Sequence, residues 1–162
     1  MAPSTTEKPT ILLVTGAWHT PKYFQTIVKQ LESQGYPSLS PQLLSCKPDG
    51  PISNMHDDAR AIQRELTRLV DAEGKKVVVF MHSYGGLVGT EAVTEELAYT
   101  KRKSAGKTGG VISLFYCTAF MVAPGMTLLN AVGDAYPPWV KLDTVSVFVL
   151  RNLGGRFDSY LL

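Results

Sequence analysis

Short apolar runs alternate with helix-like patterns along this chain, and this alternation restricts the fold more than any other feature of the sequence. Two continuous apolar runs, residues 11–14 and 77–81, are typical of strands buried on both faces, and the β-rich residues 111–117 predict another strand. Between them, apolar residues recur with a 3.6-residue period over 23–31 and 55–70. Strands and helices that alternate at this spacing predict βαβ units, and hence an α/β fold with a mostly parallel sheet flanked by helices.

The chain length fits one domain. The 162 residues leave little room for a second core. Residues 1–9 predict a flexible tail, and residues 10–162 predict a single domain. Further elements are predicted from local patterns: an extended segment at Leu39, a helix over 84–99, a solvated basic loop over 101–110, a short helix over 127–132 and a strand over 144–150.

The composition excludes several classes of protein. Sixteen Lys and Arg against fourteen Asp and Glu give a net charge of +2, which does not favour nucleic acid as a partner. No apolar run approaches the ~20 residues that span a bilayer, and the N-terminus lacks the apolar stretch of a secretory signal. Cys46 and Cys117 have no metal-ligand spacing and predict two reduced thiols, so we expect a cytoplasmic protein.

The segment 81–86, Met-His-Ser-Tyr-Gly-Gly, joins the clearest predicted strand to a helix. This is the context of a nucleophile elbow, a sharp turn that exposes a serine at the end of a strand. Gly85 stands two residues after Ser83, where the elbow needs a small residue, but Met81 stands where the G-x-S-x-G pattern has its first glycine. An ordinary turn with a capping serine is the structural alternative.

A second motif, Val-Thr-Gly-Ala-Trp-His at 14–19, follows the first predicted strand. Together with the elbow, it resembles the short esterase and hydroxynitrile-lyase-like branch of the α/β-hydrolase superfamily, which carries a His-Gly-Ala-Trp-like turn and a His-Ser-Tyr-Gly-Gly-like elbow. Thr15 stands where that branch has histidine. The resemblance covers residues 11 to about 125. It implies an α/β-hydrolase fold whose C-terminal strands are missing here, with 121–162 as a poorly matching, cap-like segment.

The resemblance implies a serine hydrolase that acts on a small carboxylic ester through an acyl-enzyme on Ser83. The backbone N–H groups of Ala17 and Tyr84 would form the oxyanion hole. Three residues of the first motif are pocket candidates: Gly16, Trp18 and His19. The implied chemistry uses no metal and no organic cofactor, and its partner is a small-molecule ester.

A serine hydroxyl needs an adjacent base, which in this fold is a histidine that follows the serine in the chain. The sequence holds His19, His56 and His82, and none follows Ser83. His82 is predicted to point away from Ser83, because adjacent side chains diverge in a strand, and His56 is predicted on the surface. A catalytically inactive or truncated hydrolase-like module, lacking the triad histidine, is therefore the alternative function.

Two further interpretations concern cofactors and partners. Thr15-Gly16 after a strand and the Tyr99-x-x-x-Lys103 spacing are also features of short-chain dehydrogenases. The bulky residues after Gly16, Pro21 among them, disfavour a pyrophosphate-binding loop.

A parallel sheet that ends early leaves an unpaired edge, so self-association through that edge is also predicted.

Overall fold

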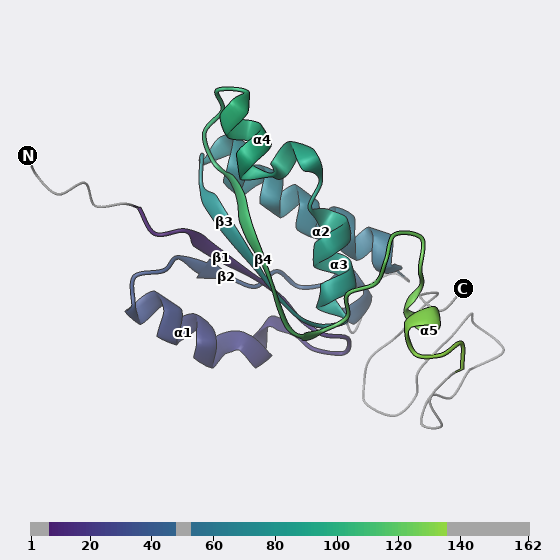
Figure 1. Ribbon diagram of the computed structural model, residues 1–162. Coiled ribbons are helices and arrows are strands. Elements are labelled where there is room, and N and C mark those ends of the chain that lie inside the picture. The colour runs from purple at the N-terminus through teal and green to yellow at the C-terminus, as the bar shows by residue number, and fades with distance from the viewer. Residues whose placement is uncertain (1–6, 48–52, 136–162) are drawn as a thin grey trace, which may run out of the picture.

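A four-stranded parallel sheet forms the centre of the computed structural model, which describes residues 7–47 and 53–135 (Figure 1). The strands are β1 (Thr10–Val14), β2 (Ser38–Leu39), β3 (Lys76–Ser83) and β4 (Gly110–Ala119), in the order β2-β1-β3-β4. Every pairing is parallel, and Val14 of β1 stands opposite Met81 of β3. The predicted α/β class with a mostly parallel sheet is confirmed.

Helices cover both faces of this sheet (Figure 1). The 3-10 helix η1 (Pro21–Phe24) and α1 (Gln25–Ser33) lie on one side, and α2 (Met55–Thr67) and α3 (Gly85–Ala92) lie on the other. A capping box between Asn54 and Asp57 begins α2, and a π-helical turn, η3 (Arg68–Ala72), extends it to the predicted stop at Gly74. The apolar stripe of α2 is buried in the core with the central strands, including Ile62, Leu66, Val79 and Met81.

The predicted helix over 84–99 is wrong in its length. It is divided into α3, a 3-10 turn η4 (Glu95–Leu97) and α4 (Tyr99–Ser104), because Val93 takes an extended conformation. The predicted loop over 101–110 is therefore helical as far as Ser104. Within it, Arg102 is buried rather than solvated, since its guanidinium binds Asp71 at 2.7 Å and donates to the Thr108 carbonyl.

Beyond β4, the short predicted helix is confirmed as α5 (Leu128–Ala131), capped by Thr127. The predicted strand over 144–150 and residues 1–6 of the predicted tail lie outside the described residues. Within residues 7–47 and 53–135, no helix has the length and apolar character that crossing a membrane requires. β4 is the edge of the described sheet next to β3, and it exposes Ile112 and Phe115.

Candidate active site

Ser83 occupies a strained turn at the end of β3. Its φ of 53° lies in the left-handed region, which costs a non-glycine residue about 1–2 kcal/mol. Tyr84 returns to helical angles, and α3 begins at Gly85. The chain therefore reverses from strand to helix at the serine itself, as the elbow motif predicts, and this geometry argues against an ordinary capping serine.

Two glycines allow the start of α3 to approach the sheet. A Cβ atom on Gly85 would lie 2.5 Å from the Val14 carbonyl oxygen and 2.6 Å from that of Thr15, and one on Gly86 would overlap the Phe120 carbonyl. Only residues without side chains fit at these two positions. The first turn of α3 is thus held directly against the carboxyl end of β1.

Met81 departs from the usual glycine of the elbow pattern, and the structure explains how it is accommodated. Its side chain is fully buried, and a Cβ atom on Gly89 would lie 2.5 Å from its sulfur. Gly89, one turn further along α3, therefore provides the space that the missing glycine would have provided. The sequence shows Gly89 but gives no local signal of this role.

Gly16 is the point at which the two motifs meet. A Cβ atom there would lie 3.1 Å from Ser83 Cβ, 3.2 Å from His82 Nδ1 and 3.5 Å from His19 Nδ1. The parallel pairing of β1 with β3 causes this, because it places the ends of both strands at the same edge of the sheet. The structure therefore brings Gly16, His19 and Ser83 together, as the sequence predicts.

The turn after β1 is held by its own hydrogen bonds. His19 Nδ1 lies 2.6 Å from the Ala17 carbonyl, and because a carbonyl only accepts, Nδ1 carries the proton. The His19 backbone N–H donates to the Gly16 carbonyl at 3.3 Å. Trp18 has a φ of 61° and packs against the core, while Ala17 is buried. Each pocket candidate thus belongs to one tight turn beside Ser83.

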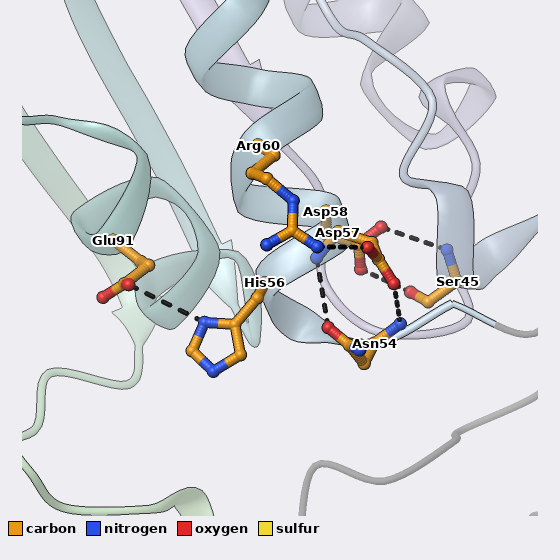
Figure 2. A network of polar contacts seen from close by, with 7 residues as sticks. All are labelled: Ser45, Asn54, His56, Asp57, Asp58, Arg60 and Glu91. Carbon is orange, nitrogen blue, oxygen red and sulfur yellow. Dashed lines mark hydrogen bonds and ion pairs between the residues drawn. The ribbon is translucent and has the colours of Figure 1, made fainter.

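The histidine predictions have mixed outcomes. His82 does not simply point away from Ser83, because its ring adjoins Gly16 as Ser83 Cβ does. The pairing of β3 with β4 shifts register between His82 and Ser83, and this irregularity breaks the alternation of side chains that the prediction assumed. His56 is exposed, as predicted, and its Nδ1 lies 3.7 Å from Glu91 (Figure 2).

The residue after the serine has a buried polar anchor that sequence reasoning missed. The Tyr84 side chain is buried, and its hydroxyl donates to Asp58 Oδ2 at 3.0 Å. Asp58 lies in the first turn of α2, where a carboxylate also favours the positive end of the helix dipole. Its neighbour Asp57 caps the helix, so the sequence offers no means of telling which of the two faces inward.

The remaining candidates lie elsewhere. Tyr99 begins α4, its ring sits 5.1 Å from the Lys76 ammonium at the start of β3, and Lys103 follows on the same helix. Ser83 is at the opposite end of β3, so the dehydrogenase pair is remote from the Gly16 turn. In the part of the chain that the structure describes, no three His, Cys, Asp or Glu side chains converge as metal ligands would.

A cavity of about 610 Å³ lies between the start of α2, α3 and the segment after β4. His56, Leu87, Glu91 and Met126 are among its lining residues, and Ser83 is not. We therefore place the candidate active site at the Gly16 turn, where the strained serine and the helix start converge, and not in this cavity.

Comparisons with known sequences identify a family for this chain. The sequence model of the Alpha/beta hydrolase family matches residues 11–160. The Alpha/beta hydrolase nvfD of Aspergillus novofumigatus is 28% identical over 134 residues, which cover 83% of this chain and 52% of that protein. The Probable hydrolase R7 of a Phoma species is 30% identical over 128 residues, covering 78% and 48%. The chain thus spans about half the length of the curated relatives it matches.

Solved structures share the same architecture. A pyrethroid hydrolase from Sphingobium faniae JZ-2 aligns with a TM-score of 0.55 at 27% identity, over 80% of this chain and 47% of that one. An extracellular alpha/beta-hydrolase from a Paenibacillus species aligns with a TM-score of 0.57 over 75% of this chain and 45% of that one. Its 14% identity supports a common fold alone.

Proposed function

Because this chain belongs to the Alpha/beta hydrolase family, we propose that it carries the nucleophile and oxyanion hole of a serine hydrolase acting on small carboxylic esters. The observation that carries the proposal is the left-handed φ of 53° at Ser83, maintained between β3 and α3. Such strain persists only where the surrounding structure imposes it, and it is concentrated at functional sites. This membership also leaves no support for the short-chain dehydrogenase alternative.

In the proposed reaction, Ser83 Oγ attacks the ester carbonyl carbon while a base takes the hydroxyl proton. The carbonyl oxygen becomes an oxyanion, and the backbone N–H groups of Tyr84 and Ala17 stabilise it at the start of α3 and in the Gly16 turn. The tetrahedral species then expels the alcohol, which receives the proton, and leaves an acyl group on Ser83. Water hydrolyses that ester in the second half of the cycle.

Turnover depends on the base that takes the proton from the Ser83 hydroxyl. The histidines of this sequence are His19, His56 and His82, and two of them adjoin Gly16 beside Ser83. Loss of a triad member typically reduces turnover by about 10⁴–10⁶. The second candidate function is a hydrolase-like module that binds esters without turning them over, and it applies if no base acts on Ser83.

A fluorophosphonate probe tests the proposal directly, because it phosphonylates only an activated serine. We expect the folded chain to be labelled and Ser83→Ala to remain unlabelled. Ser113→Ala, at an exposed position on β4, serves as the matched control and should label like the original chain. A p-nitrophenyl ester then separates turnover from a single acylation. Folded protein without Ser83-dependent labelling would overturn the nucleophile and favour the binding module.

A further inference from the structure

Asp58 is a fully buried carboxylate that connects three segments of the chain. Its exposed fraction is 0%. Ser45, in the 3-10 turn η2 (Leu44–Cys46), donates its backbone N–H at 3.0 Å to Oδ1 and its hydroxyl at 2.5 Å to Oδ2 (Figure 2). Tyr84 donates its hydroxyl to the same Oδ2 at 3.0 Å. These donors compensate the high cost of removing a carboxylate from water.

Tyr84 lies at the most sensitive point of the elbow. It follows the strained Ser83 and precedes Gly85, whose backbone rests against the Val14 and Thr15 carbonyls. Tyr84 is only 2% exposed, so packing fixes the position of its ring, and the hydrogen bond of its hydroxyl to Asp58 directs the ring toward α2. The backbone of Tyr84 is therefore held by glycine contacts from one side and by Asp58 through its own side chain.

We propose that Asp58 is a positioning residue for the chemistry at Ser83. Through the Tyr84 hydroxyl, it fixes the direction of the Tyr84 backbone N–H, which is the oxyanion donor of the proposed function on which this inference rests. An oxyanion hole is effective only when its donors lie about 2.7–3.1 Å from the developing charge. A small rotation of the Tyr84 backbone therefore reduces the stabilisation of the transition state more than it reduces the affinity for the unreacted reagent.

The neighbouring carboxylate gives a natural contrast. Asp57 accepts from the Asn54 backbone N–H at 2.9 Å and pairs with Arg60, so it stabilises the start of α2 without contacting the elbow (Figure 2). A second contrast joins β4 to α3, where the Tyr116 hydroxyl on β4 shares a 2.7 Å hydrogen bond with the Thr90 hydroxyl on α3. Asp57→Asn therefore makes the same chemical change as Asp58→Asn, and Tyr116→Phe the same change as Tyr84→Phe, without touching the contact between Asp58 and Tyr84.

The test compares Tyr84→Phe and Asp58→Asn with the controls Tyr116→Phe and Asp57→Asn, each in the full chain. For fluorophosphonate labelling of Ser83, we expect the limiting rate to fall about tenfold in the first pair, with the half-saturating probe concentration unchanged. The controls should label at the original rate. The double variant Tyr84→Phe/Asp58→Asn should be no slower than either single variant, because both remove one interaction.

Amide hydrogen exchange gives a readout that does not require a reactive serine. Tyr84→Phe and Asp58→Asn should speed exchange at residues 84–86 about tenfold, and Asp57→Asn should not. Equal exchange there in all variants, or equal labelling rates where Ser83 does label, would overturn the role of Asp58. A chain whose Ser83 never labels but whose exchange responds as expected would contradict the proposed function alone. Tyr84→Phe preserves the ring, so it carries the test if Asp58→Asn does not fold.

Discussion

The backbone of Gly85 lies against the carbonyl oxygen of Val14, so closely that a Cβ atom on Gly85 would be 2.5 Å from that oxygen. Gly→Ala usually stabilises a helix by about 1 kcal/mol. Here the added methyl meets backbone that cannot move aside, so we expect Gly85→Ala to lower the free energy of unfolding by about 1–3 kcal/mol. Urea denaturation measures the change, and labelling of Ser83 should slow in parallel.

Gly89→Ala is the matched control on the same helix. Its methyl would meet the Met81 side chain, 2.5 Å away, and a methionine side chain can change rotamer. The loss of stability should therefore be smaller than for Gly85→Ala. If both variants lost the same stability, the close approach of α3 to β1 would not be the reason for the glycine at 85.

His19 stabilises the turn that carries Ala17. Removing its 2.6 Å hydrogen bond to the Ala17 carbonyl in His19→Ala frees that turn, at a cost typical of one hydrogen bond, about 1 kcal/mol. We expect the rate of Ser83 labelling to fall about fivefold, which corresponds to that energy. His56→Ala, at the exposed pair with Glu91, should leave the rate unchanged. An unaltered rate in His19→Ala would mean that the turn holds without this contact.

The capping box of α2 predicts a dependence of stability on pH. The hydrogen bond from the Asn54 backbone N–H, followed by that from Arg60, lowers the pKa of the Asp57 carboxyl. A carboxyl whose pKa is lower in the folded state than in the unfolded state stabilises the fold at every pH above its unfolded-state pKa, near 3.9. This stabilisation is lost as the pH falls through the lower pKa of the folded state. The difference in unfolding free energy between the original chain and Asp57→Asn should therefore be largest near neutrality and shrink in acid.

Urea titrations at neutral pH and at about pH 2.5 check this dependence. Asn54→Ala removes the uncharged side chain of the same capping box, so its cost should change less with pH. A difference for Asp57→Asn that stayed constant across the titration would contradict the assignment of the stabilising charge to Asp57.

The edge of β4 predicts self-association. Phe115 is 54% exposed beside an unpaired strand edge of the described sheet, and its ring stacks on Phe80 at 5.3 Å. Apolar edges pair with other chains, and lysine on an edge prevents such pairing. Sedimentation velocity should detect oligomers whose share of the protein increases with protein concentration. That share should be smaller in Phe115→Lys. Tyr23→Lys changes an aromatic residue that is more exposed than Phe115 and lies away from β4, so it should not alter the oligomers. A stable monomer at all concentrations would contradict the prediction.

The half-buried thiol of Cys46 predicts a shifted alkylation profile. Burial raises the pKa of the Cys46 thiol, although hydrogen bonding to Ser45 opposes this. Because the thiolate is the reactive form, iodoacetamide should modify Cys46 in the folded protein with a midpoint above the ordinary value of about 8.5. Mass spectrometry in a Cys117→Ser background measures the profile. The unfolded chain in urea gives the reference, and coincident profiles would contradict the prediction.

The elements that bear the candidate site could be predicted from sequence because each has a strong local signal. The runs at β1 and β3 are continuously apolar, and parallel pairing follows from the helix between them. Gly85 and Gly86 stand at close approaches of backbone where no Cβ atom fits, and Gly16 lies in the turn beside Ser83. The left-handed Ser83 follows from the same motif.

Other features depend on tertiary contacts that leave no local signal. The burial of Arg102 depends on Asp71 and the Thr108 carbonyl, which both lie outside α4. The inward orientation of Asp58 depends on donors from Ser45 and Tyr84. The position of His82 follows from a register shift between two strands, and the alternation rule that predicts its direction holds only in regular strands.

The in-register pairing of β1 with β3 also makes the proposed reactivity of Ser83 a reporter of folding kinetics. The Gly16 turn leaves the ribosome well before the elbow, and the two remain separate until a long intervening segment closes into a loop. Closing such a loop is entropically costly, so this pairing belongs to the slow, non-local part of folding. The time at which a refolding chain first captures a serine-directed probe should therefore mark the moment at which β3 docks beside β1.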